Sequence, residues 1–296
     1  MKTMELPLVV GVDGSDMSMR AVSWAADEAV LHGVPLRLVY ASLWERYEGE
    51  ALAETLGKPS ERVLADNIVD VAAGIAHRRD PDLKVSTEVV HDDAISALVS
   101  EGRNASALVL GSRGRSGVAE VLLGSVCLAV AARADCPVIV LRGSHDNQAR
   151  TAVHRRVALG VADDQQNTEG VRFAFREAQL RGAALEAVRA WRCPARETVD
   201  HPLLTDEPAR AYEARAVEIL EAAVGEDAAA YPSVDLFRRT AEGPARKVLL
   251  GASAQADLLV VGARRRQGHL GLQIGLVTHY VLHHSRCPVA VVPQRG

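Results

Sequence analysis

Aromatic residues and cysteines are scarce in this chain. Phe, Trp and Tyr together make up 4% of its 296 residues. The core must therefore be aliphatic, which suits helices packed on a parallel sheet. The four cysteines form no CxxC pair and no zinc-like spacing with histidine, which excludes a disulfide framework in a chain of this length. We interpret them as reduced thiols, buried as small apolar side chains in a cytoplasmic protein.

An excess of positive charge and a membrane-length segment are also lacking. The formal net charge is -4, which argues against a broad basic surface for nucleic acid. No apolar run reaches the ~18 residues that a membrane span needs. The opening segment "MKTMELPLVVGVDGS" enters a strand-like run directly and lacks a signal-peptide pattern. We therefore expect neither a nucleic-acid partner nor a membrane partner.

The two halves of the chain repeat one another along their length. "VVGVDGS" at 9–15 matches "ALGVADD" at 158–164, and "ASALVLGSRGR" at 105–115 matches "QADLLVVGARRR" at 255–266. "ADCPVIVLR" near the end of the first half has its counterpart in "SRCPVAVVP" near the end of the second. A polar, glycine-led segment joins the halves. The repeat predicts two domains, 1–143 and 153–296.

Each half alternates strand-like and helix-like segments. In the first half, the expected strands cover 6–12, 35–42, 83–90, 105–112 and 136–142, and the expected helices cover 19–33, 60–79, 92–102 and 117–134. Gly124 falls inside the last helical pattern. The alternation predicts an α/β fold of two tandem, doubly wound, Rossmann-like domains, each with a five-stranded parallel sheet. Such sheets bind ligands at the carboxyl ends of their strands, near the topological switch point.

Two loops of the first half should lie at that end of the sheet. "GVDGS" at 11–15 follows the first strand and "GSRGRSG" at 111–117 follows the fourth. The second loop is rich in glycine and leads into a helix, so backbone amides and the helix dipole can attract a phosphate. The missing lysine excludes a P-loop, and two glycines after the first strand are too few for a dinucleotide fingerprint. An unusual phosphate site and a plain glycine turn remain as alternatives.

A family resemblance favours the phosphate site. Gly111, Gly114, Gly124 and Ser125 fit the pattern G-x2-G-x9-G-[ST], the nucleotide signature of the universal stress protein family. The early "GVDGS" and the late "CPVIVL" stand in the family's order, and the chain resembles the tandem-domain actinobacterial members over nearly its whole length. The resemblance implies adenine nucleotide α-hydrolase-like domains in an ATP-binding regulatory protein of the stress response.

The resemblance also implies a binding site in the first domain. The strand-one carboxylate, Asp13, would lie near the adenosine and could bind the Mg²⁺ that accompanies ATP. Alternatively, Asp13 is a turn and helix-cap residue. The residues implied at the nucleotide are Gly11, Val12, Asp13, Val39, Ala41, Gly111, Ser112, Arg113, Gly114, Gly124, Ser125 and Val126.

The second half departs from the signature. The positions of Asp13, Gly114 and Ser125 are taken by Ala162, Arg265 and Leu276. We predict that the second domain does not bind ATP in the family's manner, because these residues offer neither the carboxylate, the close backbone approach nor the hydroxyl. The arginines at 264–266 leave the binding of another anion open.

Other polar residues allow more than one interpretation. His279 and His283 have a metal-compatible spacing or simply end a helix. His91 and Asp92 follow the third strand and are either near the ligand or ordinary loop residues. No convincing catalytic base is visible, so we expect a protein that is not an enzyme, although slow ATP hydrolysis stays open. The alternatives are a nucleotide-independent interaction module and an ATP-hydrolysing enzyme.

The final strand of each half is hydrophobic and should lie at a sheet edge. An uncovered hydrophobic edge is a liability. Pairing of these strands, within the chain or between chains, would cover it, so we expect a homodimer through edge strands. The protein partner that a regulatory role implies is not identified by the sequence.

Overall fold

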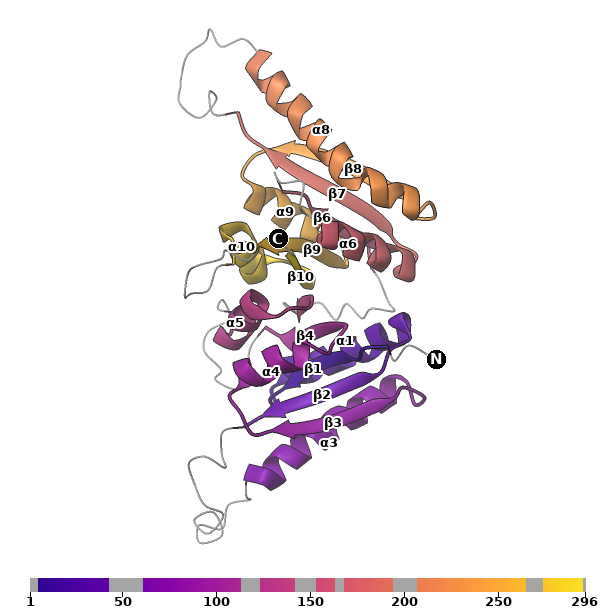
Figure 1. Cartoon of the computed structure of the whole chain (residues 1–296), viewed down its shortest axis with the longest axis vertical. Coiled ribbons are helices and arrows are strands. Elements are labelled where there is room, and N and C mark those ends of the chain that lie inside the picture. The colour runs from indigo at the N-terminus through magenta and orange to yellow at the C-terminus, as the bar shows by residue number, and fades with distance from the viewer. Residues whose placement is uncertain are drawn as a thin grey trace. The chain divides into compact units, whose positions relative to one another are not determined.

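The computed structural model describes residues 5–42, 61–112, 123–141, 153–162, 168–193, 207–264 and 274–294. The chain divides into two compact units, and the division falls in the segment that joins the two repeats. The first unit runs from indigo to magenta in Figure 1, and the second ends in yellow.

The first unit alternates strands and helices along the chain. Its elements are β1 (Leu8–Val12), α1 (Asp16–His32), β2 (Leu36–Ala41), α3 (Glu61–Arg79), β3 (Val85–Val90), α4 (Ala94–Gly102), β4 (Ala107–Gly111), α5 (Ser125–Arg133) and β5 (Val138–Leu141). The strands are parallel and lie in the order β3-β2-β1-β4-β5. Helix α1 packs with α3, and α4 packs with α5, so helices cover both faces of the sheet (Figure 1).

The second unit repeats this topology. Its elements are β6 (Arg156–Gly160), α6 (Thr168–Arg181), β7 (Ala184–Trp191), α8 (Glu207–Ala230), β8 (Leu236–Glu242), α9 (Ala245–Ser253), β9 (Leu258–Arg264), α10 (Leu276–His284) and β10 (Val289–Gln294). The strands are again parallel, in the order β10-β9-β6-β7-β8. The prediction of two tandem, doubly wound α/β units with parallel sheets is confirmed. β5 and β10 each form one edge of their own unit's sheet.

Local sequence signals fix the ends of the first helix. The hydroxyl of Ser15 accepts a hydrogen bond from the amide of Ser18 and caps the N-terminus of α1. Gly33 ends the helix in the left-handed conformation, with a φ of 69°, and its amide donates to the last turn. Helix α1 therefore begins three residues before the expected position 19, because the cap precedes the apolar pattern.

The last helix of the first unit begins later than predicted. A helix through Gly124 was expected, but Leu123 and Gly124 precede α5, and Gly124 is its N-cap with extended dihedral angles of -61° and 143°. Glycine costs about 1 kcal/mol in a helix interior relative to alanine. The amide of Gly124 donates instead to the carbonyl of Ser112 at 2.8 Å, which turns the chain toward β4.

An ion pair holds α4 against the sheet. The Arg37 guanidinium on β2 donates to the Glu101 carboxylate at the end of α4, with Nε 2.8 Å from Oε2. This hydrogen bond raises the pKa of Arg37, partly offset by burial of the guanidinium. The pair fixes α4, whose first turns line the pocket described below.

The structure confirms the prediction that the cysteines are buried as free thiols. Cys127, Cys136, Cys193 and Cys287 are all free and buried. In the part of the chain that the structure describes, no helix combines the length and the apolar character that a membrane crossing requires.

Candidate functional site

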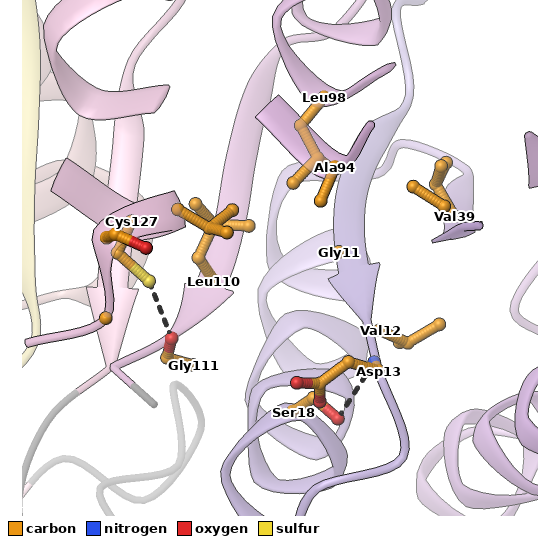
Figure 2. Close-up of a pocket in the computed structure, with 14 residues that line it drawn as sticks. Gly11, Val12, Asp13, Ser18, Val39, Ala94, Leu98, Leu110, Gly111 and Cys127 are labelled. Carbon is orange, nitrogen blue, oxygen red and sulfur yellow. Dashed lines mark hydrogen bonds between the residues drawn. The ribbon is translucent and has the colours of Figure 1, made fainter. Parts of the chain in front are cut away.

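A pocket of about 190 Å³ opens where the order of the first sheet reverses, between β1 and β4 (Figure 2). It lies at the carboxyl ends of the strands, where parallel α/β sheets bind ligands. The residues that line it are Gly11, Val12, Asp13, Ser18, Val39, Ala41, Ala94, Leu98, Leu110, Gly111, Gly124, Ser125, Val126 and Cys127.

One wall of the pocket is apolar and depends on a glycine. A Cβ atom on Gly11 would lie 2.8 Å from Leu110 Cδ2 and 3.0 Å from Leu98 Cδ2. Because Gly11 has no side chain, Leu98 from α4 can pack onto the middle of the sheet. Val39 and Ala41 at the end of β2 extend this wall. A concave apolar wall of this kind suits a flat, largely hydrophobic group such as a base.

The Asp13 carboxylate forms a turn and also lines the pocket. Asp13 Oδ1 accepts hydrogen bonds from the Ser15 amide at 3.0 Å and from the Ser15 hydroxyl at 2.6 Å. The Asp13 amide donates to Ser18 Oγ at 3.4 Å (Figure 2). Since Ser15 is the N-cap of α1, the turn that holds Asp13 and the start of the helix are one network. The turn interpretation of Asp13 is therefore correct, and it leaves the carboxylate at the pocket.

The end of β4 packs closely on the first turn of α1. A Cβ atom on Gly111 would lie 2.7 Å from the backbone carbon and oxygen of Met17, so only glycine fits there. The next residue, Ser112, is buried and lies outside the set that lines the pocket. Its amide donates to the Leu141 carbonyl at 2.9 Å and its carbonyl accepts from the Gly124 amide at 2.8 Å. The first bond joins the end of β4 to β5, and the second joins Ser112 to the N-cap of α5.

The N-terminus of α5 forms the opposite side of the pocket. Gly124 caps this helix without a side-chain hydrogen bond, and Ser125, Val126 and Cys127 form its first turn. Backbone amides and the helix dipole at such an end attract anions. Burial, together with the nearby Asp13 carboxylate, raises the pKa of Cys127 to about 12. The thiol is therefore protonated at neutral pH and donates to the Gly111 carbonyl, with Sγ 2.8 Å from the oxygen.

The structure brings most of the predicted site residues to this one pocket. Those that line it are Gly11, Val12, Asp13, Val39, Ala41, Gly111, Gly124, Ser125 and Val126. Ser112 lies beside it, and Arg113 and Gly114 lie outside the described residues. His91 and Asp92 precede α4 and are not among the lining residues; Asp92 Oδ1 accepts from the Asp93 amide at 2.8 Å.

Five lining residues were not predicted. They are Ser18, Ala94, Leu98, Leu110 and Cys127. The apolar members gave only the ordinary periodic signal of a core helix or strand. Whether such a residue packs beside a glycine and so reaches the pocket depends on how elements distant in the sequence pack together. Cys127 had a usable signal, because it directly follows the predicted Ser125 and Val126 in the first turn of the helix.

The second unit keeps the glycine packing but differs in its polar groups. A Cβ atom on Gly160 would lie 2.9 Å from Leu249 Cδ1, as in the Gly11 and Leu98 contact of the first unit. Ala162, at the position of Asp13, is exposed. Leu276, at the position of Ser125, is the first residue of α10 and is 89% exposed. Arg265 lies outside the described residues.

Two histidines of α10, His279 and His283, lie against each other with their rings tilted by 36°. The ring centroids of His279 and His283 lie 4.5 Å apart. Within the described residues, no group of three His, Cys, Asp or Glu ligands includes this pair. Among the residues that the structure describes, this pair therefore has no third protein ligand for a metal ion.

Two tandem, doubly wound α/β units, the first with a pocket at its switch point, place the chain in a class of folds that bind ligands at the carboxyl ends of their strands. Comparisons narrow the class to one family. Residues 6–142 and 154–293 each match the model of the universal stress protein family. This chain belongs to the universal stress protein family.

Similar proteins span the whole chain. Universal stress protein Rv2005c of Mycobacterium tuberculosis is 36% identical over 296 residues, which cover 97% of each chain. A universal stress protein of Mycolicibacterium smegmatis is 30% identical over 301 residues, with 98% of each chain covered. The crystal structure of a universal stress protein from Archaeoglobus fulgidus has a TM-score of 0.68 at 16% identity and covers 98% of both chains, which shows the same fold.

Proposed function

We propose that this protein is an ATP-binding regulatory factor of the stress response and that its first unit holds the nucleotide. The observation that carries the proposal is the pocket at the switch point. It combines an apolar wall, one carboxylate and a helix N-terminus capped by glycine. These three features match the base, the sugar with its metal ion, and the phosphates of a nucleotide.

Each part of the ligand has a counterpart in the pocket. The adenine would pack against the wall formed by Gly11, Val39 and Leu98. Asp13, oriented by its two hydrogen bonds from Ser15, would hold the ribose or the accompanying Mg²⁺. The phosphates would bind at the amides of α5 and the hydroxyl of Ser125. Arg113 and Gly114 would complete this end of the site, as the family signature implies.

We propose ATP as a ligand that sets conformation or partner choice. Among the lining residues, Asp13 is the one carboxylate, and its Oδ1 already accepts two hydrogen bonds. None of the lining residues is a histidine, lysine or glutamate. Phosphoryl transfer to water needs a group that orients the nucleophile. The described part of the site thus supplies no general base, and any hydrolysis would be slow.

The second unit has a structural or regulatory role in this proposal. Ala162 offers no carboxylate, and Leu276 offers no hydroxyl to a phosphate. We also propose that the protein forms a homodimer through its hydrophobic edge strands and acts on a protein partner. It would act in the cytoplasm, where ATP is abundant and its free thiols stay reduced.

The test is the nucleotide stoichiometry of the full chain. The protein is saturated with ATP and Mg²⁺, free ligand is removed, and the nucleotide released on denaturation is identified and counted per chain. We expect about one ATP per chain, consistent with a single ATP site. About two would overturn the proposal for the second unit. Release of no nucleotide would overturn the proposed function and leave the interaction module as the alternative. ATP turnover of ~1 per second would favour an enzyme.

A reciprocal pair of variants assigns the site. Ser125→Leu copies the second unit and should weaken ATP binding roughly 10-fold or more, because a hydrogen bond to a charged group contributes about 1.5–3 kcal/mol. Leu276→Ser, at the equivalent position of the second unit, should leave the affinity unchanged. If Ser125→Leu and the unaltered protein bound ATP with equal affinity, α5 would not be part of the binding site.

A further inference from the structure

The thiol of Cys127 joins the first turn of α5 directly to the end of β4. Cys127 is the third residue of α5, and its Sγ lies 2.8 Å from the carbonyl oxygen of Gly111, the last residue of β4 (Figure 2). The side chain is buried, with 5% of the residue exposed, and it lines the pocket together with Ser125.

The orientation of the Gly111 carbonyl affects several neighbouring backbone hydrogen bonds. Because a peptide group is planar, its orientation fixes the amide of Ser112, which donates to Leu141 at 2.9 Å. The carbonyl of Ser112 in turn accepts from the amide of Gly124, which directly precedes α5. Gly111 itself has little freedom, since even a Cβ atom on it would lie 2.7 Å from the backbone of Met17. Cys127 thus closes a chain of bonds that runs from β5 through β4 to the first turn of α5.

We propose that Cys127 is a positioning residue of the nucleotide site. By holding the Gly111 carbonyl, its side chain sets the distance between the end of β4 and the amides of α5, and so the affinity for the phosphate part of the ligand. The base wall, formed by α4 and the strands, does not depend on this bond. The inference rests on the proposed function, because it assigns one residue to the binding of the phosphates.

The donor must be the protonated thiol. Burial keeps it in that state at neutral pH, as the raised pKa of about 12 indicates. Serine can donate in the same direction, whereas alanine cannot. The two substitutions therefore separate the hydrogen bond from the mere presence of a side chain.

The experiment compares the affinities of ATP and adenosine in the full chain by titration calorimetry with Mg²⁺. We expect Cys127→Ala to weaken ATP binding about 5-fold, the effect of losing one neutral hydrogen bond, and to change adenosine binding less than about 2-fold. Cys127→Ser should retain the ratio of the two affinities.

Two variants serve as matched controls. Cys136→Ala removes another buried thiol of the first unit, one that does not line the pocket. Thr278→Ala truncates the buried side chain at the equivalent position of the second unit. Both should leave the ATP-to-adenosine ratio unchanged.

The outcomes separate this inference from the proposed function. Suppose that the unaltered protein binds ATP. If Cys127→Ala then weakens the binding of ATP and of adenosine equally, or changes the binding of neither, Cys127 has no positioning role. If the unaltered protein binds no nucleotide, the proposed function fails and this inference fails with it. Should the alanine variant not fold, the isosteric pair Cys127→Thr and Cys127→Val repeats the comparison: threonine must keep the ratio and valine must lose it.

Discussion

Leu98 packs against Gly11, with its two Cδ atoms 3.0 and 3.1 Å from the point that a Cβ atom on the glycine would occupy. Gly11→Ala should therefore push the leucine toward the pocket. We expect a loss of stability of about 1–2 kcal/mol from overpacking and a marked fall in nucleotide affinity. Urea unfolding and calorimetric titration measure the two effects.

The second unit supplies the control for this substitution. Gly160 has the same relation to Leu249, with Cδ1 2.9 Å from the Cβ position. Gly160→Ala should cost a similar free energy of unfolding and leave nucleotide binding intact. If both alanine variants lowered the affinity equally, the effect would come from general destabilisation and the pocket assignment would be wrong.

Gly111 should be the least replaceable glycine of the site. Its Cβ position lies 2.7 Å from backbone atoms of Met17, which cannot move without shifting α1. We expect Gly111→Ala to cost ~3 kcal/mol, at the upper end of overpacking effects. Gly251→Ala is the control, because nothing lies within 4 Å of that Cβ position in α9. It should be neutral or slightly stabilising. Equal thermal midpoints for the two variants would contradict the close approach.

Asp257 anchors the start of the second unit. Its buried carboxylate accepts hydrogen bonds from the amides of Val153, His154 and Arg156, at 2.9, 3.0 and 3.1 Å. Asp257→Ala leaves these donors unsatisfied, so we expect a loss of ~3 kcal/mol and faster hydrogen exchange at all three amides. Asp257→Asn keeps one oxygen, so its loss of stability should lie between zero and that of Asp257→Ala. In the first unit the equivalent position is Ser106, where Ser106→Ala should cost ~1 kcal/mol. Unchanged exchange at the three amides in Asp257→Ala would refute the anchor.

The order of strands and helices could be predicted because each element carries its own pattern. Short β-branched runs alternate with helical spacing in both repeats, and parallel strands joined by helices have few arrangements. The start of α5 could not be predicted from periodicity. The apolar pattern continues through Gly124. The backbone of Gly124 is extended, however, and its amide donates to the carbonyl of Ser112, so the helix begins only after it. That bond joins two residues that are not neighbours in the sequence, and local propensity does not reveal it.

Several glycine and polar residues of the pocket, such as Gly111, Gly124 and Ser125, could be named from the sequence because phosphate binding favours few residue types, whereas the polar lining residue Ser18 could not. The apolar wall was predicted only in part, at Val39 and Ala41. Leu98 has the same apolar periodicity as any core residue of α4, and only the packing of that helix on Gly11 brings it to the pocket. Asp13 forms the turn that one sequence interpretation expects and also lines the pocket, and its role at a nucleotide stays a prediction.

Alkaline pH should destabilise this protein through its buried thiols. Burial raises the pKa of Cys127, Cys136 and Cys287 from the usual 9.0 to about 12. Between these values the unfolded chain has released thiol protons that the native protein still holds. The free energy of unfolding therefore falls as pH rises through this window, and the stabilisation is fully present below the lower value.

Replacing two of these thiols tests the linkage. The variant Cys136→Ala with Cys287→Ala leaves the pocket thiol in place and removes two groups from the titration. Its unfolding free energy, measured by urea at a series of pH values, should be lower at neutral pH because of the cavities. Above pH ~9, however, its decline should be shallower by roughly 1 kcal/mol per pH unit for each thiol removed. Lysine and tyrosine titrate in both proteins, so the difference isolates the thiols, and parallel curves would show that the native protein does not hold these protons.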